Sequence, residues 1–136
     1  MRVVESLLRS EKDGGLSFGN YTLNEKAKLS DFEFDGDVYK VKTYNEITKL
    51  EKNGLFVYES VPGSSVFGLK VSESEVTFTV EGKDDVQITL ELESETEYEV
   101  LIAGESTGTM KTNLGGKLVF SVETAGKDVD VKVVKR

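Results

Sequence analysis

The sequence predicts a mainly β fold of antiparallel strands, and three observations support this class. After Gly15, apolar residues recur at every second position, as in Leu16/Phe18 and Phe32/Phe34, which is the period of a strand with one buried face. Turn sequences such as "GN" and "DGD" separate these runs, and such pairs favour tight hairpins. From Ser64 onward, candidate strands follow about every ten residues, a rhythm typical of a β-sandwich. They span 65–71, 75–81, 86–92, 97–103, 107–112, 117–122 and 129–135.

Composition excludes several kinds of chemistry. The chain of 136 residues contains no cysteine, histidine or tryptophan. Disulfides, thiol nucleophiles, Cys/His zinc sites and imidazole bases are therefore excluded. We expect no cofactor, no metal site and no enzymatic activity.

The charge of the chain is acidic and uneven. The net charge is −8 at pH 7, and most of the acidic excess follows residue 62; from Val71 to Glu99 the only basic residue is Lys83. Nucleic acids and anionic lipid surfaces attract clustered Lys and Arg. We therefore expect neither nucleic acid nor a membrane as a partner, and no apolar run is long enough to span a bilayer.

The first residues predict a short amphipathic helix. Glu5 and Arg9 are spaced as an i,i+4 ion pair, and "DGG" at 13–15 is a typical helix end. The helix would pack on its own domain or dock into a neighbouring subunit. Its apolar face would consist of Val3, Val4, Leu7 and Leu8.

The same segment lacks the features of an export signal. Charged Glu5, Arg9 and Glu11 interrupt the apolar stretch that a signal peptide requires. A cytoplasmic location is therefore expected, and a surface or secreted location remains open for a longer form of the chain.

Residues 43–54 are ambiguous between a helix and a hairpin. Thr43 and Glu46 form a capping-box pattern, whereas Asn53-Gly54 is a strong hairpin signal. The hairpin is favoured, with a second strand from Leu55 to Glu59. Residues 55–58 are apolar on both faces, so this strand should be covered by the second half of the chain or by another subunit.

A boundary is expected at Val61-Pro62-Gly63, where the charge balance and the strand spacing change. Residues 1–62 would form the N-terminal helix and a small antiparallel sheet, and residues 63–136 a β-sandwich.

Three groups of polar residues are better explained by structure than by a catalytic or metal-binding site. Asp35-Gly36-Asp37 could be a carboxylate pair, but the sequence favours a hairpin turn. Ser64 and Ser65 follow Pro62-Gly63 without a histidine to activate them. The alternating glutamates of 91–99 predict a solvated strand face, because calcium prefers a loop that wraps around it.

The stretch "LESETEYEVLIAG" resembles the fibronectin type III and wider immunoglobulin-like group. Leu92, Thr96 and Tyr98 match the Leu-x-x-x-Thr-x-Tyr pattern of that group, which implies that the Tyr98 hydroxyl bonds back to the turn as a tyrosine corner. Residues 98–122 also resemble terminal immunoglobulin-like modules of polysaccharide-acting enzymes. Both resemblances imply an immunoglobulin-like sandwich without a catalytic residue.

Over nearly its whole length the chain is similar to small uncharacterised bacterial proteins that are sometimes labelled endosialidase. The likeness runs through "SFGNYTLNEKAKLSDFEFDGD", "VKTYNEITKLEKNG", "YESVPGSSV" and "MKTNLGGKLVFSVE". Sialidases hold the sugar carboxylate with clustered arginines, but the arginines of this chain are Arg2, Arg9 and Arg136, all near its termini. The activity is therefore not expected.

The function expected from the sequence is a non-enzymatic interaction or assembly module that binds protein and forms a homo-oligomer. A free sheet edge could also serve this association. The alternative is a carbohydrate-binding accessory module that stacks sugars on Tyr44 and Tyr58. The expected interface residues are Val4, Leu7, Leu8, Leu55, Phe56 and Tyr58.

Overall fold

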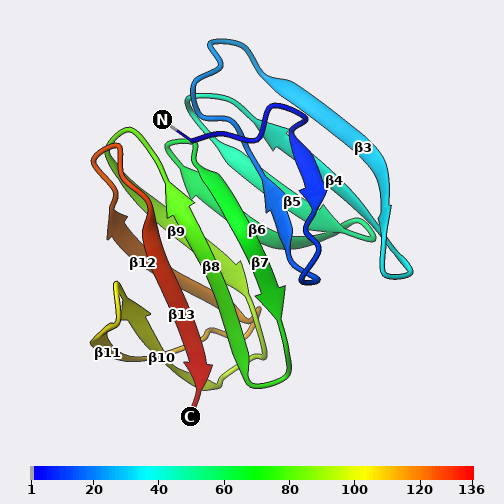
Figure 1. Cartoon of the computed structure of the whole chain (residues 1–136). Helices are drawn as coiled ribbons and strands as arrows, with labels where there is room; N and C mark the ends of the chain where they lie inside the picture. The colour runs from blue at the N-terminus through cyan, green and yellow to red at the C-terminus, as the bar shows by residue number, and fades with distance from the viewer. Residues whose placement is uncertain (1) are drawn as a thin grey trace.

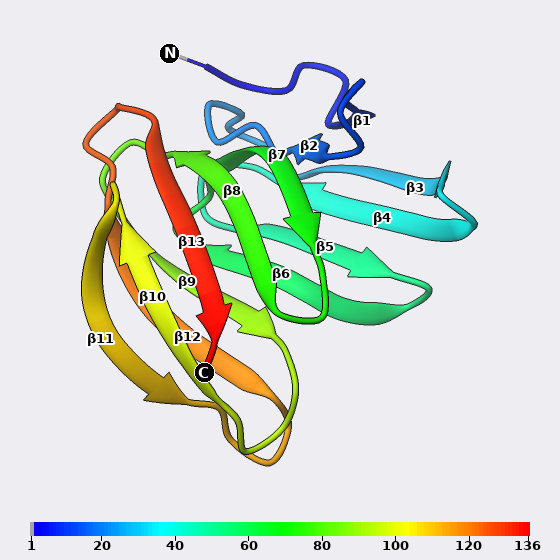
Figure 2. The ribbon, with the colours of Figure 1, turned by 60° about the horizontal axis from the view of Figure 1, so that its bottom comes forward.

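The computed structural model describes residues 2–136 as two antiparallel β-sheets stacked on each other (Figure 1, Figure 2). The prediction of a mainly β protein is confirmed. The seven-stranded sheet contains, in spatial order, β1 (Leu8–Ser10), β2 (Leu16–Phe18), β7 (Ser65–Val71), β8 (Glu75–Glu81), β13 (Val129–Lys135), β10 (Glu97–Ile102) and β11 (Glu105–Lys111). The six-stranded sheet contains β12 (Lys117–Glu123), β9 (Asp85–Glu91), β6 (Leu55–Val61), β5 (Thr48–Lys52), β4 (Asp37–Thr43) and β3 (Ala27–Phe34).

The expected N-terminal helix is wrong. Residues 8–10 form β1, which pairs with β2 so that Leu8 lies opposite Phe18. Leu7 has a φ of 72°, a left-handed conformation that an α-helix cannot contain. The strand is preferred because burial of Val4 and Leu8 in the core outweighs local helix propensity. Within residues 2–136, no helix is long and apolar enough to cross a membrane.

The expected division at residue 62 does not match the sheets, because each sheet contains strands from both sides of that residue. In the seven-stranded sheet, β2 pairs with β7, placing Leu16 opposite Leu69. In the six-stranded sheet, β6 pairs with β9, placing Tyr58 opposite Leu90. At residues 62–64 the chain crosses from one sheet to the other, instead of leaving a small N-terminal sheet for a separate sandwich. Apolar side chains of both segments share one core.

Both expected hairpin turns are present. Asn53 and Gly54 join β5 to β6 with φ values of 52° and 79°, and Asp35 and Gly36 join β3 to β4 with 53° and 82°. Positive φ at both central residues matches the twist of the flanking strands. The hairpin is therefore confirmed over the helix for the segment that ends at Gly54.

Tyr58 is the centre of the core. It is fully buried, and its ring packs edge-on against Phe18 of β2 at 5.2 Å and Phe78 of β8 at 5.8 Å between centroids. Its hydroxyl lies 2.8 Å from the Ser64 Oγ, which also lies 2.6 Å from the Ser60 Oγ. Burial raises the pKa of Tyr58, so the hydroxyl stays protonated and joins the two sheets as a neutral hydrogen-bonding group.

A buried hydroxyl network holds the crossing between the sheets. The Thr48 hydroxyl donates to the Ser64 carbonyl oxygen at 2.7 Å and accepts from the Ser64 N–H at 3.0 Å. The Thr48 hydroxyl has one proton, which it gives to Ser64, so the Thr43 hydroxyl is the donor in the 2.8 Å hydrogen bond between the two threonines. The Thr43 hydroxyl in turn accepts from the Asn20 N–H at 2.9 Å. Gly63 is required beside this network, because a Cβ there would overlap the carbonyl oxygen of Tyr44.

Replacing Thr48 with Val should destabilise the protein strongly while keeping its shape. The Thr48→Val substitution leaves the Ser64 N–H and carbonyl oxygen buried without a partner and removes the acceptor of the Thr43 hydroxyl proton, at an expected cost of about 3 kcal/mol in the free energy of unfolding. Urea unfolding followed by circular dichroism measures this loss. Thr109→Val on the exposed strand β11 is the matched control, and a loss no larger than that of the control would contradict the role of the network.

Candidate functional site

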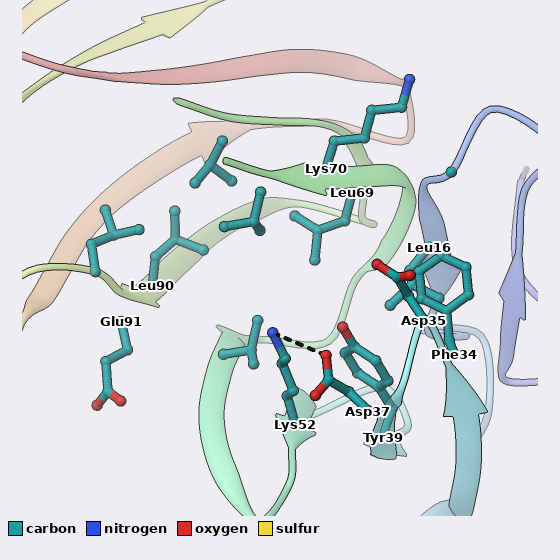
Figure 3. Close-up of a pocket in the computed structure, with 15 residues that line it drawn as sticks. Leu16, Phe34, Asp35, Asp37, Tyr39, Lys52, Leu69, Lys70, Leu90 and Glu91 are labelled. Atoms are coloured by element: carbon teal, nitrogen blue, oxygen red, sulfur yellow. Dashed lines mark ion pairs between the residues drawn. The ribbon is translucent and has the colours of Figure 1, made fainter. Parts of the chain in front are cut away.

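A cleft of about 470 Å³ opens at one end of the sandwich, where five turns or strand ends meet (Figure 3). We call it the end cleft. Its volume lies in the range of small-ligand pockets. Its floor is apolar and buried, whereas its walls are partly exposed. The floor consists of Leu16, Tyr39, Leu69, Val76 and Leu90, and the walls include Phe34, Val57, Val71 and Leu92.

The β3–β4 and β5–β6 hairpins supply one wall of the end cleft. Their register places Lys52 opposite both Tyr39 and Leu55, so these side chains project from the same face of the six-stranded sheet. Figure 3 shows Lys52 and Asp37 of this wall grouped beside Tyr39, where the wall meets the floor. The ring of Phe34 lies 6.3 Å from that of Tyr39.

The charges of the rim are mostly neutralised by local partners. The Asn53 amide donates to Asp37 at 2.9 Å, and the Lys52 ammonium lies 3.4 Å from the same carboxylate. The Asn53 hydrogen bond, assisted by Lys52, holds the pKa of Asp37 below its ordinary value. The Asp37 carboxylate is therefore ionised at neutral pH and places a negative charge at the rim of the end cleft.

Two further rim charges are also paired. The Lys70 ammonium lies 3.1 Å from Asp13. Glu91 accepts a hydrogen bond from Lys117 at 2.7 Å. Of the charged side chains that line the cleft, Asp35 has no ion pair within residues 2–136.

Exposed apolar side chains surround the opening. Val71 lines the cleft and is 62% exposed, and Leu55, which is 67% exposed, lies next to it as the strand partner of the lining residue Lys52. Apolar groups that are grouped around a cleft, unlike scattered ones, indicate a contact surface. The end cleft is therefore the candidate site.

The expected interface residues are mostly buried. Val4, Leu8 and Tyr58 lie in the core, each at most 2% exposed, so they have no surface to offer a partner in this fold. Leu7 is half-buried against the core. Phe56 is also half-buried, because the Lys117 ammonium lies 3.7 Å from its ring centroid.

The two residues expected to stack sugars are occupied by other contacts. The Tyr58 ring is enclosed by Phe18 and Phe78. Tyr44 donates its hydroxyl to Glu46 at 2.6 Å, and the Lys26 ammonium lies 5.7 Å from its ring centroid.

The other polar clusters are structural. Ser64 belongs to the buried hydroxyl network, and the buried Ser65 hydroxyl has no hydrogen-bond partner within residues 2–136. Along the glutamate-rich segment, Glu93 pairs with Lys135 at 2.8 Å. No group of three or more acidic side chains is arranged as a metal site in the described part of the chain.

Sequence reasoning did not identify Phe34, Leu69 or Val71 as site residues. The available signal was the position of apolar side chains next to turns, as at Val71 before "SES" and Leu55 after Asn53-Gly54. This signal shows that a turn ends in an apolar residue, but it does not show which turns meet in space.

The fold and the end cleft define an all-β, two-layer protein with an apolar, charge-rimmed opening between its sheets. No family model, curated protein or solved structure matches the chain.

The Asp37→Asn variant should be slightly less stable than the wild type at neutral pH. Because the folded pKa of Asp37 lies below the ordinary 3.8, its contribution is complete above that value and is lost as pH falls through the folded pKa. Urea unfolding at several pH values should therefore show a difference that disappears in acid. Asp35→Asn is the control without an ion pair, and a difference that grows on acidification would contradict the assignment.

Proposed function

We propose that the protein is a non-enzymatic interaction module of the immunoglobulin-like β-sandwich type, which associates with a second copy through its open end. The observation that carries the proposal is the pair of exposed side chains, Leu55 and Val71, beside an apolar cleft. Each copy offers both a projecting apolar group and a recess that can receive one. A symmetric contact between two such ends buries both sets of groups.

The expected association is weak. Full burial of a leucine or valine side chain contributes about 2 kcal/mol, so the two copies together gain about 8 kcal/mol from Leu55 and Val71. Lost translational and rotational freedom opposes this gain. Because this loss is at least about 4 kcal/mol, at most about 4 kcal/mol remains, and the dimer should dissociate at about 1 mM, a reversible contact that depends on concentration.

The chemistry of the rim supports a binding role rather than catalysis. A carboxyl that donates protons near neutral pH has a raised pKa, whereas that of Asp37 is lowered by Asn53 and Lys52. The arginines are spread over separate ion pairs, Arg2 with Asp128 and Arg9 with Glu11. The proposal therefore keeps the likeness to the endosialidase-labelled proteins without their activity.

The immunoglobulin-like type is supported by Tyr98. Its ring is buried, and its hydroxyl accepts a hydrogen bond from the Glu93 N–H at 3.3 Å. This contact returns to the turn five residues upstream in the chain, as a tyrosine corner does. It ties the β9–β10 connection to the core.

Leu55→Asp should abolish self-association and leave the fold intact, because the side chain is mostly exposed and a carboxylate cannot enter an apolar recess. Sedimentation velocity from about 10 μM to 1 mM should show a concentration-dependent dimer for the wild type and a monomer for the variant. Leu114→Asp is the matched control, since Leu114 is 81% exposed in the β11–β12 connection, outside the cleft.

Two results would contradict this proposal. One is a wild-type protein that remains entirely monomeric at about 1 mM, the expected dissociation constant, where about half of the chains should be dimeric. The other is equal weakening of the dimer by Leu55→Asp and Leu114→Asp.

A second candidate function is carbohydrate binding, favoured by the aromatic rings of Phe34 and Tyr39 beside the carboxylates of Asp35 and Asp37 in the end cleft. Aromatic faces stack on sugars and carboxylates accept their hydroxyl hydrogen bonds.

Under this second candidate, polysaccharide in a native gel should retard the wild type and not Phe34→Ala. Tyr44→Ala removes an aromatic ring away from the cleft and is the control. Absence of retardation on a broad glycan panel would exclude carbohydrate binding.

A further inference from the structure

Three of the four sheet edges carry features that hinder pairing with another strand. β1 has only three residues. β3 contains a register shift between Leu29 and Phe32, with Asp31 at a φ of 60°. The β10–β11 pair shifts register, and β11 contains Gly108 at a φ of 106°. Short strands, bulges and irregular backbone protect edges from addition of another chain.

The fourth edge, β12, has none of these features. It pairs with β9 over seven consecutive residues without a register shift, and residues 117–123 contain no glycine, proline or positive φ. Leu118, Phe120 and Val122 are buried in alternation with outward-facing residues such as Val119. Within residues 2–136 no strand pairs with its outer side. The Lys117 N–H donates to the Asn113 side-chain oxygen at 3.0 Å and its carbonyl oxygen accepts from the Asn113 N–H at 3.4 Å, so the regular row of free backbone donors and acceptors begins at Val119.

The arrangement of the two sheets leaves room for one strand beside β12. Tyr58 of β6 contacts Phe18 of β2 and Phe78 of β8, the two strands that flank β7, so β6 lies across from β7 and β8. From there the seven-stranded sheet continues through β13, β10 and β11, whereas the six-stranded sheet continues through β9 and β12 only. β11 therefore extends past the edge formed by β12, and Figure 2 shows it as the outermost strand on that side.

The space next to β12 fits a strand and not a second sandwich. Met110 of β11 pairs with the buried Tyr98, so it points toward the interior, yet it is only half-buried. An added strand would lie under β11 and cover Met110. A second complete copy would bring strands of its own seven-stranded sheet to the place that β11 occupies, so its edge could not approach in the same way.

The two ends of β12 differ in charge. Glu123 lies directly opposite Asp85, a destabilising like-charge pair, and neither residue has an ion pair within residues 2–136. Lys117 lies opposite Glu91 and donates to it at 2.7 Å. Its ammonium has further protons to donate. A partner strand is therefore favoured when it brings a cation to Glu123 and an anion to Lys117.

We propose that the outer edge of β12 binds an extended peptide segment of a partner protein by antiparallel strand addition. Backbone hydrogen bonds supply the affinity, and alternating apolar side chains facing the interior supply the specificity. A basic residue of the segment faces Glu123, and an acidic residue faces Lys117. The proposal rests on the interaction function proposed above but uses a different surface from the end cleft.

The sequence of β12 is itself a suitable probe. In an antiparallel pairing centred on Phe120, a capped peptide KLVFSVE places its lysine opposite Glu123 and its glutamate opposite Lys117. Its leucine, phenylalanine and second valine then face the interior. The labelled peptide is tested by fluorescence anisotropy against the Leu55→Asp protein, in which end-to-end association does not contribute.

Glu123→Lys should weaken binding of this peptide at least fivefold, because two lysines then face each other. This substitution also relieves the repulsion with Asp85, so the fold is retained. A peptide whose lysine is replaced by glutamate should recover the lost affinity with the Glu123→Lys protein. Glu33→Lys, at the opposite edge of the same sheet, is the matched control and should leave the affinity unchanged.

Hydrogen exchange locates the bound peptide independently. Amides of β12 should exchange more slowly in the complex, whereas those of β3 should be unaffected, because only β12 gains backbone partners. Protection that maps to the turns around the end cleft would overturn the proposal.

Four other outcomes also test the proposal. Equal peptide affinity of the Glu123→Lys and Glu33→Lys proteins would overturn strand addition, as would absence of binding at millimolar peptide. If Glu123→Lys, and not Leu55→Asp, abolishes self-association of the whole chain, then the occupant of the edge is a second copy and the partner-peptide proposal is wrong. If Leu55→Asp abolishes self-association but no peptide binds, only the proposal for the β12 edge is wrong, and the proposed association through the end cleft is retained.

Discussion

The fold depends on the hydroxyl network at the point where the chain crosses from one sheet to the other. Thr48 satisfies both backbone groups of Ser64, and Tyr58 reaches the Ser64 hydroxyl from the centre of the core. Buried polar groups are costly unless paired, so this network allows the crossing only in one geometry. It thereby places β7 across from β6 and makes one core from both halves of the chain.

The contacts proposed at the end cleft and at the β12 edge both follow from this arrangement, but they would depend on different physics. At the end cleft, side chains such as Leu55 and Val71 remain exposed because the turns that carry them lie beyond the stacked part of the sheets. Its binding energy comes from apolar burial. At β12 the unpaired groups belong to the backbone, and recognition depends on extended conformation. The two proposed contacts therefore use separate surfaces of one sandwich.

Local patterns predicted the strands and turns well because they are encoded by neighbouring residues. The expected strands at 75–81 and 129–135 coincide with β8 and β13, and the turns at Asp35-Gly36 and Asn53-Gly54 have the expected backbone. The helix predicted for the N-terminal segment was wrong because the same apolar spacing also suits a short strand that packs its side chains beside β2. The site residues Phe34 and Val71 were missed since they meet only when distant turns are brought to the same end.

The sequence by itself determined the antiparallel β class, the hairpin turns and the absence of imidazole and thiol chemistry, because these depend on residue type and on neighbours in the chain. Only the tertiary structure decided that Tyr58 is buried while Leu55, in the same strand, is exposed. Both faces of that strand are apolar, so its pattern cannot distinguish them. Burial depends instead on pairings between distant residues, such as Leu16 with Leu69 and Tyr58 with Leu90, and such pairings form only in the assembled sandwich.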